Sequence, residues 1–189
     1  VAGDLVKLRR WRQRGVRVSA HTMCRVADNG NVAAMRCLIT ELGAAVNQGT
    51  QGGGHTPLFV AAQRAHLALV CCLSTEFSAD VNQGMPLGCT PLFAASRHRR
   101  LEVIRYLGKS GANVNQATCD GATPLMIAAQ RGHMDAVRCL VRELSADINQ
   151  ADHGGHPPLF FACQDGHLAT ARCMVRELGA DINQADCAG

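Results

Sequence analysis

The chain has 189 residues, a formal net charge of +4, 47% hydrophobic residues and 4% aromatic residues. This composition is sufficient for a continuous core built from Leu, Val, Ala and Cys, and no run approaches the ~18 apolar residues of a membrane span. The charge is uneven: the first 17 residues carry a formal +5, which leaves −1 for the remaining chain, so there is no general signal for polyanion binding.

A basic helix is predicted over residues 3–18. Leu5, Leu8 and Trp11 share one face, whereas most of the cations lie on the others. We interpret residues 1–18 as a degenerate half unit that caps the following structure and solvates its exposed end. The alternative is that this helix binds nucleic acid or an anionic surface, and steep weakening of binding by salt would identify that function.

The rest of the chain is repetitive. The heptapeptide ADINQAD occurs at 146–152 and again at 180–186, and related text precedes it at three earlier places. The shared Asn of these segments stands at Asn47, Asn82, Asn115, Asn149 and Asn183. A near-constant period of 33 to 35 residues indicates a repeat array.

Each unit begins with a helix start. Thr-Pro-Leu opens the segments at 56–58, 90–92 and 123–125, and Pro-Pro-Leu opens the segment at 157–159. A Thr hydroxyl can accept a free backbone N–H, and Pro is well placed at the first helical position. Because Pro157 replaces the Thr, we expect a weaker cap in the last unit.

A second helix and a turn complete each unit. In the stretch MDAVRCLVREL the apolar residues recur at helical spacing, from Met134 to Leu144. The polar, Gly-bearing text between NQ and the next TPL predicts a projecting turn or hairpin. Most units also carry one extra residue before that turn, so we expect a slightly altered geometry where the helix ends.

The segment GATPLMIAAQRGHMDAVRCLVRELSADINQ resembles the ankyrin repeat, and so does GCTPLFAASRHRRLEVIRYLGKSGANVNQ. The resemblance implies an all-α fold, a helix-turn-helix repeat solenoid with projecting β-turn or hairpin loops. It places about five helix pairs in residues 19–189, which end inside the start of a further repeat. The family's His after TPL is replaced here by Phe59, Phe93, Met126 or Phe160.

The last helix, LATARCMVREL, is as apolar as the internal ones, although a terminal repeat needs a polar outer face. We therefore expect the sequence to be a piece of a longer protein.

The 10 cysteines favour an intracellular, reducing compartment over a disulfide scaffold. Four share one repeat position, where we expect a buried column: Cys37, Cys72, Cys139 and Cys173. Cys24 and Cys163 are also expected on the core side. Cys71, with the turn residues Cys89, Cys119 and Cys187, is expected to be exposed and oxidisable.

Catalytic and metal chemistry have little support. His153 and His156 lie three apart in one turn, and Cys119 and Cys187 occupy the position of His153 in the units on either side. Established zinc spacings are absent, so no metal site is predicted. No nucleophile has a recognisable catalytic motif, and no glycine-rich loop carries the Lys of a phosphate site. We expect no enzyme activity and no cofactor. His66, His133 and His167 are expected to bond backbone between helices.

The resemblance implies that a partner protein binds along the concave face formed by turn tips and first helices. The candidate residues are those without a packing role. They are His55, Gln63, Arg64, Leu87, Cys89, Arg97, His98, Cys119, Asp120, Ala122, Gln130, Arg131, His153, His156, Gln164 and Asp165.

We therefore predict a non-catalytic protein-protein interaction module in the cytoplasm or nucleus. It is expected to recognise its partner by several weak contacts at once. The partner's identity stays open. Nucleic acid is the less favoured ligand, and a monomer without a membrane span is expected.

Overall fold

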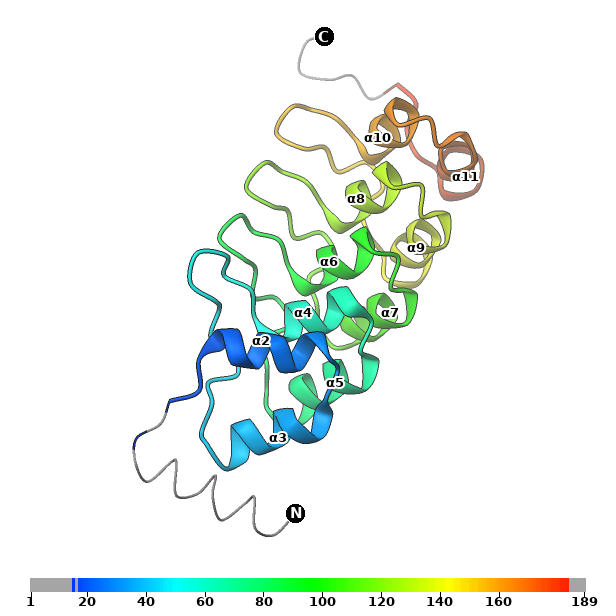
Figure 1. Ribbon diagram of the computed structural model, residues 1–189. Coiled ribbons are helices and arrows are strands. Elements are labelled where there is room, and N and C mark those ends of the chain that lie inside the picture. The colour runs from blue at the N-terminus through cyan, green and yellow to red at the C-terminus, as the bar shows by residue number, and fades with distance from the viewer. Residues whose placement is uncertain (1–14, 16, 184–189) are drawn as a thin grey trace.

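The computed structural model describes residue 15 and residues 17–183. Within them the chain forms five helix pairs, stacked side by side in two layers, with loops that project from the first-helix layer (Figure 1). The first helices are α2 (Ala20–Asp28), α4 (Pro57–Arg64), α6 (Pro91–Arg97), α8 (Pro124–Gln130) and α10 (Pro158–Gln164). The second helices are α3 (Val32–Thr40), α5 (Leu67–Cys71) continued by η1 (Cys72–Glu76), α7 (Leu101–Lys109), α9 (Met134–Arg138) continued by η2 (Cys139–Glu143), and α11 (Leu168–Leu178). We number the five pairs as units one to five.

The first helices begin where the Thr-Pro-Leu pattern predicts. Thr56 accepts a hydrogen bond of 3.2 Å from the N–H of Phe59, and Thr90 and Thr123 cap α6 and α8 in the same way. No side chain caps α10, whose preceding residue is Pro157, so the expectation of a weaker cap there is confirmed. Unit one lacks the motif altogether, and Ser19 caps α2 instead.

The core lies between the two layers and runs through the stack. Each first helix contacts the first helix of the next unit and the second helix of its own unit. The small residues Ala61, Ala95 and Ala128 are buried completely, which lets neighbouring helices approach closely. Leu140, at a predicted core position of the second helix, is also fully buried.

In units two and four the extra residue before the turn is accommodated by a wider helical turn. In η2 the N–H of Leu144 bonds to the carbonyl of Cys139, five residues back, and η1 has the same π-helical form. The chain then turns through Ser145, whose φ is 58°. The expected change in geometry is therefore confirmed in these two units, whereas α11 of unit five stays α-helical to its end and is followed by Gly179 with a φ of 77°.

Asn residues join consecutive units. The side-chain oxygen of Asn47 accepts from the N–H of Asp80 at 3.0 Å. The next three Asn residues repeat the bond one unit further along each time: Asn82 to Asn113, Asn115 to Asp147, and Asn149 to Asp181. This ladder needs an Asn at the same place in every unit, which explains why the Asn recurs.

The residues next to this Asn in the heptapeptide also form hydrogen bonds at the junction between units. Asp147 accepts from the N–H of Asn149 at 3.0 Å and closes a local turn. Gln150 donates to the carbonyl of Asn115 at 3.3 Å in the preceding unit. The repeated text is therefore the polar connection between adjacent units.

A second ladder joins the turns between first and second helices. The Nε2 of His66 donates to the carbonyl of Asp28 at 2.9 Å, and His133 donates to that of Arg97 at 3.2 Å. In unit three Arg100 takes this place and donates to the carbonyl of Gln63. These bonds confirm the backbone role predicted for His66 and His133, and they show that the accepting carbonyl belongs to the preceding unit.

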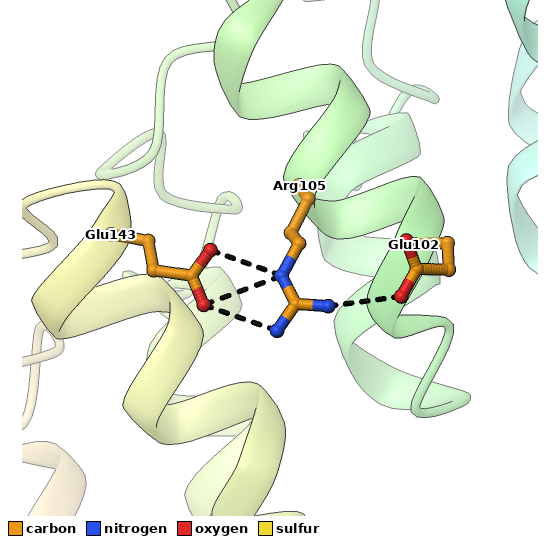
Figure 2. A network of polar contacts seen from close by, with 3 residues as sticks. All are labelled: Glu102, Arg105 and Glu143. Carbon is orange, nitrogen blue, oxygen red and sulfur yellow. Dashed lines mark hydrogen bonds and ion pairs between the residues drawn. The ribbon is translucent and has the colours of Figure 1, made fainter.

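Ion pairs link the second helices. Arg105 of α7 pairs with Glu143 of η2 at 3.0 Å and with Glu102 of its own helix at 2.9 Å (Figure 2). Arg36 pairs with Glu76, and Arg138 with Glu177, in the equivalent places. Arg36 and the glutamates are exposed and Arg105 and Arg138 are partly exposed, so water screens these pairs and each contributes little to stability.

The face of unit five that points away from unit four carries exposed apolar side chains. Phe160 is 36% exposed, whereas Phe93 and Met126 at the equivalent position are 7% and 2% exposed. Leu168 and Ile182 are 65% and 68% exposed. In the described part of the chain no further unit packs on this face.

The prediction that Cys163 lies on the core side is wrong for this reason. Cys163 is exposed, although its equivalent Ala129 is fully buried. Cys72, Cys139 and Cys173 are buried as predicted, whereas Cys37 in unit one is only partly buried. Cys71 and Cys89 were expected to be exposed and are also only partly buried.

The basic helix predicted within residues 1–18 lies outside the described residues, apart from positions 15, 17 and 18. Cys187 also lies outside them. Within the described residues no helix is long and apolar enough to cross a membrane.

Candidate functional site

Loops between units form a row of fingers (Figure 1). Each closes with one hairpin bond: in unit three the N–H of Met85 bonds to the carbonyl of Cys89 at 3.0 Å, and in unit four Thr118 bonds to Ala122 at 2.9 Å. Adjacent fingers also touch, because the N–H of Cys119 donates to the carbonyl of Leu87 at 3.0 Å. The fingers therefore hold one another in place along the stack.

We call the fingers, together with the outward residues of the first helices, the finger surface. All sixteen predicted site residues lie on it, and none is buried. The exposed ones are Arg64, Leu87, Arg97, Cys119, Asp120, Arg131, His153, Gln164 and Asp165. The partly buried ones are His55, Gln63, Cys89, His98, Ala122, Gln130 and His156.

The three arginines of this surface are not equivalent. Arg64 is already engaged, because its Nε lies 2.6 Å from the carboxylate of Asp28 in unit one. Arg97 and Arg131 form no ion pair with any described residue, so their charges remain available. Repeat alignment places Arg131 level with Arg64, but Arg97 level with Gln63, so the arginines do not form a single straight row.

His98 stands in the middle of this positive charge. Its ring accepts a hydrogen bond of 3.1 Å from the amide of Gln63, an arrangement that requires the neutral imidazole. Burial lowers the pKa of His98, and neighbouring cations lower it further. Those cations belong to Arg100, Arg97, Arg131 and Arg64.

Hollows lie at the bases of the fingers. One of about 240 Å³ lies between units two and three, and we call it the 2–3 hollow. It is lined by His55, Phe59, Gln63, Met85, Cys89, Phe93, Ala94, Arg97 and His98. A second, the 3–4 hollow, measures about 330 Å³. It is lined by Leu87, Cys89, Phe93, Arg97, Thr118, Cys119, Asp120 and Ala122.

The two hollows adjoin, because Cys89, Phe93 and Arg97 line both. Together they make a trough whose 3–4 half is mostly apolar and whose 2–3 half is lined by polar as well as apolar side chains, with Arg97 on the wall between the two halves. Leu87, at a finger of the 3–4 hollow, is 67% exposed. Leu87 therefore continues the apolar lining of the 3–4 hollow out to the surface, which makes one contiguous apolar area of a kind that marks contact sites.

Negative charge lies toward the C-terminal end of the trough. The hydroxyl of Thr118 donates to Asp120 and lowers the pKa of that carboxyl group, so Asp120 is ionised at neutral pH. Further along, the ring of His156 lies 3.2 Å from Asp152 and 4.3 Å from the ring of Phe160. The imidazole of His156 is therefore held by its own unit.

The described cysteines of the finger surface differ in reactivity. Burial raises the pKa of the Cys89 thiol, so this half-buried residue is a poor nucleophile. Cys119 is exposed, as predicted, and its thiol lies 3.6 Å from the carbonyl of Pro86. No group of three or more potential metal ligands converges anywhere in the described ranges.

The site contains residues that the sequence analysis did not select. Phe59, Met85 and Phe93 line the trough, although none of them was among the predicted site residues. Phe93 also packs in the fold, since it is 7% exposed and still lines both hollows. The signal for this role was the exchange of the family's His for Phe at that position.

Comparison with known proteins identifies the family. A family model for ankyrin repeats (3 copies) matches residues 23–118 and 110–186, which together cover most of the chain. A comparison with the curated proteins gives no match. The stacked helix pairs, the fingers and this match agree, and the chain belongs to the ankyrin-repeat family.

Proposed function

We propose that this protein is a non-catalytic binding module that holds a partner protein against the concave side of the stack, on the finger surface. Ankyrin repeats are generally protein-protein interaction modules. The observation that carries the proposal is the trough made by the two adjoining hollows, with the open Leu87 beside it and the unpaired Arg97 in its wall.

The physical mechanism is preorganisation. The Asn ladder and the bonds between fingers fix the trough before a partner arrives, so little conformational entropy is lost on binding. A partner that buries Leu87 removes an apolar side chain from water, which stabilises the complex by about 1.5 kcal/mol. Arg97 and Arg131 add charge complementarity, which mainly sets specificity and association rate.

Affinity capture from cell lysate, followed by mass spectrometry, tests this function. The test variant carries Arg97→Glu and Arg131→Glu, because Arg64 is excluded by its pair with Asp28. The control carries Arg172→Glu and Arg176→Glu on α11, which make the same charge change at exposed positions of the opposite layer.

A protein retained by the parent and by the α11 control, but lost by the finger-surface variant, supports the proposal. Circular dichroism first establishes that all three proteins are folded. Equal retention by all three, or recovery of nucleic acid that disappears as salt rises, contradicts it and moves the function to the basic segment at residues 1–18.

A further inference from the structure

We propose that the trough takes an extended acidic segment of the partner, in which two apolar side chains three residues apart fill the two hollows and a carboxylate between them binds Arg97. This inference rests on the proposed function and names the chemistry that the finger surface recognises. It depends on three properties of the trough: the spacing of its hollows, the position of its cation and the position of Asp120.

The spacing of the hollows selects the backbone conformation. Consecutive first helices pack against each other, which places equivalent points of neighbouring units roughly 8–10 Å apart. A polyproline II segment rises ~3.1 Å per residue with three residues per turn, so every third side chain returns to the same face after about 9 Å. A β-strand would turn residues three apart to opposite faces. An extended segment of the polyproline II type therefore matches the repeat.

The lining of the 3–4 hollow is mostly apolar and favours an apolar anchor, whereas the 2–3 hollow combines apolar side chains with polar ones such as Gln63 and His98. Phe59 and Met85 line the 2–3 hollow, Leu87 lines the 3–4 hollow, and Phe93 is common to both. Each hollow is large enough to take a branched aliphatic side chain, at about 240 and 330 Å³. The neutral His98 adds no charge to this lining at neutral pH.

The cation selects an acid between the anchors. Arg97 lines both hollows, so its side chain lies beside the part of the segment that separates the two anchors. In a three-residue turn those residues point to either side of the anchor face, and one of them therefore points toward the first helices. Arg97 has no carboxylate partner among the described residues, so an incoming carboxylate displaces no existing ion pair.

The carboxylate of Asp120 restricts where along the trough the acidic residue of the partner segment can lie. Asp120 lines the 3–4 hollow and is ionised at neutral pH, so it repels a carboxylate placed beyond the second anchor. The same charge disfavours a nucleic acid, whose phosphates would continue past Arg97 onto this aspartate. A protein segment whose acidic residue lies only between the two anchors pairs with Arg97 and avoids repulsion by Asp120.

Fluorescence anisotropy with short labelled peptides tests the inference on the whole chain. The probe is GSLEELSG, which places two Leu residues three apart with Glu between them. Three matched peptides each change one property: GSLKKLSG reverses the charge, GSSEESSG removes the anchors, and GSLEEGLSG lengthens the spacing by one residue.

The probe should bind most tightly, and each of the three changes should weaken binding by roughly tenfold or more, since a charge-assisted hydrogen bond and a buried Leu side chain are each of that order. Arg97→Gln should weaken the probe by about tenfold but leave the neutral peptide GSLQQLSG nearly unaffected. Arg176→Gln on α11 serves as the control and should change neither peptide.

Equal binding of the Glu and Lys peptides, no effect of Arg97→Gln, or no saturable binding at millimolar concentration overturns the inference. The capture experiment separates this failure from failure of the proposed function. If the capture experiment finds a partner that the finger-surface variant loses, but the peptides do not bind, the proposed function stands and only the acidic-segment specificity is wrong. If the capture experiment also shows no difference between the variants, the finger surface is not the binding surface.

Discussion

The side-chain oxygen of Asn82 accepts a hydrogen bond of 2.7 Å from the backbone N–H of Asn113, one unit further along the chain. The amide nitrogen of the same side chain donates to the carbonyl of Gly111 at 3.1 Å. One side chain thus satisfies two backbone groups of the next unit, in the region where the chain leaves its second helix and enters its finger.

Replacement of Asn82 by Ala should destabilise the stack. It leaves two backbone groups just after α7, the carbonyl of Gly111 and the N–H of Asn113, without their partners. Because water reaches this junction, the expected loss is about 1 kcal/mol. For a chain of this size that corresponds to a fall in Tm of roughly 2–4 °C. Gln48→Ala is the control, because Gln48 is exposed and its side chain forms no hydrogen bond with another described residue, whereas Gln83 in the next unit donates to the carbonyl of Asn47. An unchanged Tm for Asn82→Ala contradicts a stabilising role for the ladder.

Replacement of Leu140 by Ala should destabilise far more than replacement of Leu87. Leu140 is fully buried, so truncation leaves a cavity and costs about 3 kcal/mol. Leu87 is 67% exposed, and Leu87→Ala should lower Tm little while it weakens partner binding. Urea unfolding and capture, measured on both variants, check the two halves. A large loss of stability for Leu87→Ala would show that this side chain has a packing role.

Ala substitutions at two glycines of the inter-helix turns distinguish the cost of backbone strain from the cost of steric contact. Gly132 and Gly166 have φ values of 66° and 75°, so an Ala at either position is strained, at about 1 kcal/mol. A Cβ on Gly132 would also lie 2.5 Å from the ring of His167, whereas a Cβ on Gly166 would meet nothing within 4 Å. Gly132→Ala should therefore lower stability more than Gly166→Ala.

Removal of the His167 ring provides the check on that explanation. In the double variant with His167→Ala, the excess loss at Gly132 should disappear, which gives a favourable coupling in a double-mutant cycle. Equal stability of the two Gly→Ala variants, measured by denaturant unfolding, would mean that the ring moves aside without loss.

Stability should fall as the pH falls from about 7 to 5. Burial lowers the pKa of His98 and of His133 below the ordinary value of 6.5. Below about pH 6.5 the unfolded chain therefore binds protons that the folded chain does not, and the free energy of unfolding decreases. Thermal unfolding across this range measures the effect, above the pH where carboxylates protonate.

Gln at these positions should flatten the pH dependence. His98→Gln retains an acceptor for Gln63, and His133→Gln retains a donor for the carbonyl of Arg97. His21→Gln at an exposed position of α2 is the control. If both test variants keep the full pH dependence of the parent, the two imidazoles are not its source.

Much of the fold could be predicted from the sequence because the pattern is local. Thr56 followed by Pro57 specifies a helix start through its own hydroxyl and ring, and the 33 to 35 residue period specifies stacking. The extra residue before Ser145 could be counted, but the π-helical turn that absorbs it could not be distinguished from a longer loop. That choice depends on packing of the second helices, which no short segment contains.

The candidate surface was predicted only in outline. Position in the repeat identified Leu87 and Arg97 as outward residues, since packing roles repeat with the period. The pairing of Arg64 with Asp28 was not visible, because the two residues come from different units and meet only when the units stack. The exposure of Cys163 was missed for the same reason, since burial of that position requires a following unit.

The sequence alone determined the helix pairs, their order and their caps, because these follow from interactions within about ten residues and from a repeated pattern. Tertiary structure decided which charges remain free, which hollows adjoin and how the fingers meet. Those properties arise between units, from groups 31 to 35 residues apart, such as the side chain of Asn82 and the backbone N–H of Asn113, or the side chains of Gln63 and His98. Only the geometry of stacking brings such pairs within bonding distance, and the proposed binding surface depends on that stacking.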